Sequence, residues 1–83
     1  MRSIQILYFA ALRDRMGVAA EDVALPDEVG DVRALGIWLE ATRPGLRGVL
    51  GSVRFAVGDE FAALDRALRA GDVVALLPPV SGG

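Results

Sequence analysis

Hydrophobic and polar residues alternate at the start of the chain, as they do in a strand with one buried face. In residues 3–9, Ile4, Ile6 and Tyr8 share one face. Residues 73–77 are apolar on both faces, which is typical of a strand in the middle of a sheet. The pattern therefore predicts an opening strand and a central closing strand.

Three more strands are predicted where short apolar runs end at turn residues. Pro26 closes the first of these runs, and Gly58-Asp59 forms a tight turn between the other two. The predicted ranges are residues 21–25, 53–57 and 60–62.

Helical spacing appears in one long stretch, residues 31–42, where Asp31 is suited to cap the first turn. One stripe of this helix is apolar enough to cover a sheet, whereas Ile37 points away from it. The residues of the stripe are Val32, Leu35, Trp38, Leu39 and Thr42. Shorter helical elements are predicted over residues 10–16 and residues 64–68.

This order of elements suits an α+β domain with one mixed sheet of about five strands, covered by one main helix. A single helix covers only one face of a sheet. Phe9, Phe61 and Leu77 are expected on the other face, which the chain itself leaves uncovered. We therefore predict a protein-binding patch there.

The composition excludes several kinds of side-chain chemistry. The 83 residues, best read as one small domain, include no Cys or His, and all nine cations are Arg, so the chain lacks thiolates, imidazoles and side-chain amines. No metal site is expected, and a net charge of −2 argues against binding nucleic acid through its phosphates. The absence of a long apolar segment favours a cytoplasmic protein that does not contact a membrane.

The last six residues form a segment that is rich in proline and glycine. Pro78 and Pro79 lack backbone donors, so a strand that reaches them leaves its sheet as an extended arm. Val80, Ser81, Gly82 and Gly83 follow, and the glycines let a backbone enter a narrow channel. We expect a domain over residues 1–77 and a tail over residues 78–83 whose terminal carboxylate is a substrate for partner proteins.

The chain resembles the small-subunit family of molybdopterin synthase, sulfur carriers with a ubiquitin-like β-grasp fold that end in Gly-Gly. The resemblance covers essentially the whole chain, and its last stretch is the most specific part. The residues on which the resemblance rests are Leu7-Tyr8-Phe9-Ala10, Leu12-Arg13, Gly17, Ala56-Val57 and the stretch from Leu68 to Gly83.

The resemblance implies a sulfur-carrying cycle. An ATP-dependent adenylating enzyme, similar to ubiquitin-activating enzymes, would activate the Gly83 carboxylate, and a sulfur donor would convert it to a thiocarboxylate. Residues 78–82 would insert into the large subunit, which supplies the catalytic side chains, and deliver sulfur to cyclic pyranopterin monophosphate. The chain itself would be a non-catalytic carrier of a sulfurtransferase, with no bound cofactor. Arg13 coincides with an arginine of the family and joins Phe9, Phe61 and Leu77 in the expected interface.

Three alternatives remain open. A thiamin-thiazole sulfur carrier shares the fold and the Gly-Gly ending, although such carriers tend to lack the Pro-Pro-Val before it. A ubiquitin-like modifier would be conjugated through Gly83 to lysines of other proteins. A plain binding module would not need its last two residues.

Overall fold

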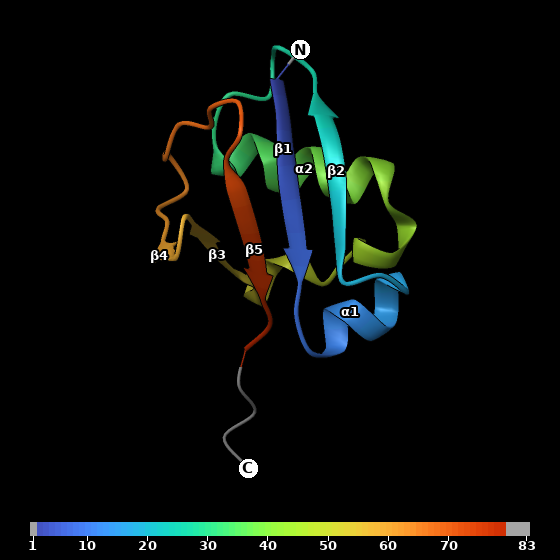
Figure 1. The fold of residues 1–83 in the computed structure, drawn as a ribbon. Coiled ribbons are helices and arrows are strands. Elements are labelled where there is room, and N and C mark those ends of the chain that lie inside the picture. The colour runs from blue at the N-terminus through green and yellow to red at the C-terminus, as the bar shows by residue number, and fades with distance from the viewer. Residues whose placement is uncertain (1, 80–83) are drawn as a thin grey trace.

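Five strands form one mixed sheet in the computed structural model, which describes residues 2–79 (Figure 1). Their order across the sheet is β2-β1-β5-β3-β4. The central strands β1 and β5 run parallel, and the other neighbours are antiparallel. The bounds are β1 Arg2–Tyr8, β2 Ala20–Leu25, β3 Arg54–Val57, β4 Glu60–Phe61 and β5 Val73–Leu77.

The main helix α2, Val32–Thr42, crosses one face of this sheet and lies behind β1 and β2 in Figure 1. It begins where expected, because the Asp31 carboxylate accepts a hydrogen bond from the Ala34 amide at 2.8 Å. The shorter α1, Ala11–Met16, ends at Gly17, whose φ of 76° suits a residue without Cβ. Two short 3-10 helices, Pro44–Leu46 and Leu50–Ser52, connect α2 to β3.

The core fills the space between α2 and one face of the sheet. Ile6 of β1 and Leu76 of β5 are fully buried, and they pack with Leu35 and Leu39 of α2. Tyr8 is buried as well, which confirms the predicted inner face of the first strand. The predicted α+β class, with one mixed sheet and one main helix, is confirmed.

The predicted helical turn over residues 64–68 is wrong. The structure has a turn there, followed by a β-bridge between Ala67 and Asp31. The carbonyl groups of Leu64 and Arg66 accept hydrogen bonds from the first backbone amides of α2, at 2.8 and 3.1 Å. This segment therefore satisfies the free donors of another helix instead of forming its own.

The stripe of α2 also needs correction at its end. Thr42 is exposed, and its hydroxyl donates to the Trp38 carbonyl at 2.8 Å. Trp38 is only partly buried against the core, whereas Val32, Leu35 and Leu39 are fully buried and Ile37 is exposed. The end of α2 after Leu39 therefore lies beyond the core and carries polar contacts. Within residues 2–79, no helix combines the length and apolarity needed to cross a membrane.

Candidate functional site

The face of the sheet opposite α2 carries an apolar row that crosses four strands. The pairing of the strands sets Leu7 beside Ala75, Ala75 beside Ala56, and Ala56 beside Phe61. Leu7 is half-buried and Phe61 is 62% exposed. Because the two central side chains are small and the two outer ones are large, the middle of this face is hollow.

This hollow, here called the open-face groove, has a volume of about 420 Å³. Most of its lining is apolar, with Asp59 as the charged exception. The lining residues are Leu7, Phe9, Ala56, Gly58, Asp59, Phe61, Val73, Ala75 and Leu77.

A second hollow, here called the tail-base groove, lies where β5 ends and has a volume of about 880 Å³. Phe9, Phe61 and Leu77 line both grooves, so the structure brings together the three apolar residues predicted for the interface. The other residues that line the tail-base groove are Ala10, Ala11, Arg54, Pro78 and Pro79.

The remaining predicted site residues divide into three groups. Pro78 is half-buried and Pro79 is exposed at the tail-base groove, next to the end of β5. Arg13 is exposed on α1 and is not among the residues that line either groove. Val80, Ser81, Gly82 and Gly83 lie outside the described residues, so the predicted insertion and chemistry of the tail stay predictions.

Sequence reasoning missed Arg54, an exposed residue at the start of β3. Its guanidinium carbon lies 4.0 Å from the centroid of the Phe61 ring, within the range of a cation–π contact. Alternation along residues 53–57 offered a signal, because Arg54 and Ala56 must point to the same face. The alternation shows that Arg54 lies on the groove side of the sheet only when the pairing of β3 with β5 is known.

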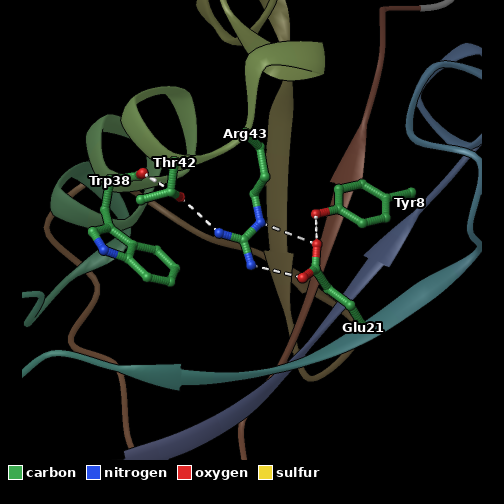
Figure 2. A network of polar contacts seen from close by, with 5 residues as sticks. All are labelled: Tyr8, Glu21, Trp38, Thr42 and Arg43. Atoms are coloured by element: carbon green, nitrogen blue, oxygen red, sulfur yellow. Dashed lines mark hydrogen bonds and ion pairs between the residues drawn. The ribbon is translucent and has the colours of Figure 1, made fainter.

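Sequence reasoning also missed a polar network beside the end of α2, which Figure 2 shows. Glu21 of β2 receives two hydrogen bonds from Arg43, at 2.6 and 3.1 Å, and one from the hydroxyl of Tyr8 at 2.5 Å. The Arg43 guanidinium also lies 4.9 Å from the Trp38 ring centroid. A buried tyrosine hydroxyl needs a partner, so Tyr8 was the available signal.

The network perturbs the titration of its members. The hydrogen bond from Arg43 holds the pKa of Glu21 below its usual value, and the same bond raises the pKa of Arg43. Burial, followed by the hydrogen bond to Glu21, raises the pKa of Tyr8. All three groups are therefore held in the protonation states that pair them, which suits a structural tie between β1, β2 and α2.

The described residues offer no assembled centre for metal chemistry. No group of three or more His, Cys, Asp or Glu side chains in residues 2–79 is placed to hold a metal ion. The site is therefore a surface: two adjoining apolar grooves, one cation and the base of the tail. Exposed apolar grooves of this kind are typical of protein-binding surfaces.

The order of the strands, the single helix that covers the sheet and the open apolar face together define a small protein of the ubiquitin-like β-grasp class. The chain belongs to the ThiS family, which it matches over residues 6–83. The two final glycines lie inside the matched range.

Known proteins share both the sequence and the fold. The molybdopterin synthase sulfur carrier subunit of Homo sapiens is 36% identical, with 96% of this chain and 93% of that protein covered. The crystal structure of SAMP1 from Haloferax volcanii is 30% identical, with a TM-score of 0.83, over 98% of this chain and 99% of that one. A chain from the complex of subunits 1 and 2 of the molybdopterin-converting factor of Helicobacter pylori is 27% identical, with a TM-score of 0.70 and coverage of 98% and 99%.

Proposed function

We propose that this chain is the sulfur carrier subunit of a molybdopterin synthase and that the Gly83 carboxylate carries the sulfur. The observation that supports it most is the meeting of Phe9, Phe61 and Leu77 beside Pro78, at the base of the Gly-Gly tail. A partner that covers the two grooves would hold the tail at a fixed starting point. The relatives named as sulfur carrier subunits support the same assignment.

The proposed cycle starts with a poor electrophile. In the adenylating partner, the Gly83 carboxylate attacks the α-phosphorus of ATP, pyrophosphate leaves, and an acyl adenylate forms. Sulfide-level sulfur from a donor then attacks the acyl carbon, AMP leaves, and the chain ends in a thiocarboxylate without any redox change. In the large subunit this sulfur passes to cyclic pyranopterin monophosphate, water restores the carboxylate, and a second loaded carrier completes the dithiolene.

The composition of the chain indicates which steps of the cycle the partner proteins carry out. We assign general acid and base steps to the large subunit, because this chain lacks His, the commonest general base, and also lacks Lys. The chain contributes the reactive end and the surface that positions it. ATP serves the activating partner as a substrate, and we place the cycle in the cytoplasm, where ATP is supplied.

Intact-mass spectrometry tests the loading step. The purified chain is incubated with an adenylating enzyme, ATP and a sulfur source. We expect a gain of about 16 Da, the difference between sulfur and oxygen, confined to the C-terminal peptide. A variant that lacks Gly82 and Gly83 is the matched control and gains nothing. An unchanged mass with an enzyme that loads a known carrier would contradict the proposal.

Conjugation to other proteins is the second candidate, and the likeness to SAMP1, a small archaeal modifier protein, is the observation that favours it. It predicts high-mass adducts that contain this chain and that disappear when Gly83 is deleted. A carrier devoted to sulfur transfer predicts the thiocarboxylate without adducts. Separating the adducts under denaturing conditions distinguishes the two.

A further inference from the structure

Arg54 lines the tail-base groove beside Leu77, Pro78 and Pro79. It is the first residue of β3 and pairs in register with Leu77, the last residue of β5. Its guanidinium stacks on Phe61, which lines both grooves. The residue therefore stands at the edge of the surface that also carries the base of the tail.

The charge of Arg54 is unpaired within residues 2–79. Its side chain makes the stacking contact with Phe61 and neither an ion pair nor a hydrogen bond with the described part of the chain. The other charged residue that lines a groove is Asp59, which lines the open-face groove alone. Arg54 is thus the single cation in the lining of the described grooves.

A partner that covers the open face also changes the hydration of the Arg54 guanidinium. A partner that packs on Phe61 and Leu77 also removes water from Arg54, because the guanidinium lies on the Phe61 ring. A guanidinium that is dehydrated without an anion is strongly destabilising. A tight complex therefore needs a negative group from the partner at this point.

The chemistry of the site favours a carboxylate for that negative group. A guanidinium stacked on a ring keeps the N–H groups at its rim free, and these match the two oxygens of a carboxylate. The surrounding lining is apolar, as in the centre of a protein interface where one charged pair selects the partner.

We propose that Arg54 is a specificity-determining residue of this interface and pairs with an aspartate or glutamate of the large subunit, which packs apolar side chains into the two grooves. This inference rests on the proposed function, since the large subunit is the partner named there. The complex of subunits 1 and 2 from Helicobacter pylori shows that a related chain does assemble with a second subunit.

The test measures the affinity of the chain for the large subunit by titration calorimetry, with three variants. Arg54→Gln keeps the size but removes the charge, and we expect it to weaken binding roughly 30-fold, the effect of leaving a buried charge without its partner. Arg54→Glu sets two carboxylates together and weakens binding further. Arg33→Glu, an exposed arginine on α2 and so on the covered side of the sheet, is the charge-matched control and leaves affinity unchanged.

Salt dependence identifies the contact as ionic. Raising the ionic strength should weaken binding of the unaltered chain more than that of Arg54→Gln, because only the former has a charge pair at this point. Equal affinities for the unaltered chain and both Arg54 variants would overturn the inference.

Two further outcomes separate this inference from the proposed function. If Arg54→Gln slows loading by the adenylating enzyme and leaves the affinity for the large subunit intact, the anion belongs to the activating complex and the inference is wrong. If the unaltered chain is neither loaded with sulfur nor bound by the large subunit, the proposed function itself fails. Melting curves of each variant exclude loss of folding as the cause.

Discussion

The two faces of the central strand β5 carry the same kinds of residue, but one face packs in the core and the other lines the two grooves. Leu76 points toward α2 and is fully buried, whereas its neighbour Leu77 points to the opposite face and lines both grooves. Both are leucines, and both keep the strand apolar. Within residues 2–79, α2 covers one face of the sheet and nothing covers the other, so hydrophobicity alone does not distinguish a core residue from a residue on the open face.

The largest expected effect comes from placing a charge on either side of β5. Leu76→Asp should prevent folding, because it buries an unpaired carboxylate in the core. Leu77→Asp should leave the fold in place and abolish binding to the large subunit. Circular dichroism and calorimetry on the same preparations measure the two effects. If Leu77→Asp also unfolds the chain, or if it still binds, the distinction between the faces breaks down.

The next effect concerns the polar network on the covered side. Glu21→Gln should lower the free energy of unfolding by about 2 kcal/mol, because Arg43 loses a charged partner that is only partly exposed. Arg43→Gln should cost a similar amount, and the double variant little more. Urea unfolding of the four proteins gives the coupling. Additive losses would show that the pair is not a unit.

The same pair gives the protein a defined pH dependence. The pKa of Glu21 is lower in the folded chain than its ordinary value of 4.5, so the pair stabilises the fold fully above that pH. The contribution is lost as the pH falls through the lowered pKa. Melting temperatures of the unaltered chain and Glu21→Gln should therefore start to approach each other below about pH 4.5 and meet once the pH is below the lowered pKa. A constant difference down to pH 2 would contradict this assignment.

The smallest effect is expected on the outer side of α2. Ile37 is 67% exposed and points away from the sheet, so Ile37→Ser should change stability by less than about 0.5 kcal/mol and leave partner binding unchanged. Weaker binding in this variant would place an interface on α2 and would weaken the contrast between an open and a covered face.

Local sequence patterns were sufficient for much of the fold. Alternation assigned Ile4, Ile6 and Tyr8 to the covered face, and the cap at Asp31 located the start of α2. These features depend on neighbours within a few residues. Phe9, Phe61 and Leu77 could be named for a related reason, since one helix leaves one sheet face uncovered.

Contacts between distant segments could not be predicted in the same way. Arg54 lies beside the base of the tail because β3 pairs with β5, and no local pattern contains that strand order. The Glu21–Arg43 bond joins residues separated by 22 positions. The segment that was expected to form a helical turn instead satisfies the amides of α2, another distant contact.

The most direct measurement of the central claim follows the unloading of the carrier. The chain, loaded with sulfur at Gly83, is mixed with the large subunit and cyclic pyranopterin monophosphate, and its intact mass is followed over time. We expect a loss of about 16 Da that requires both components and that Leu77→Asp prevents. A loaded chain that keeps its sulfur beside an active large subunit and its substrate would contradict the account.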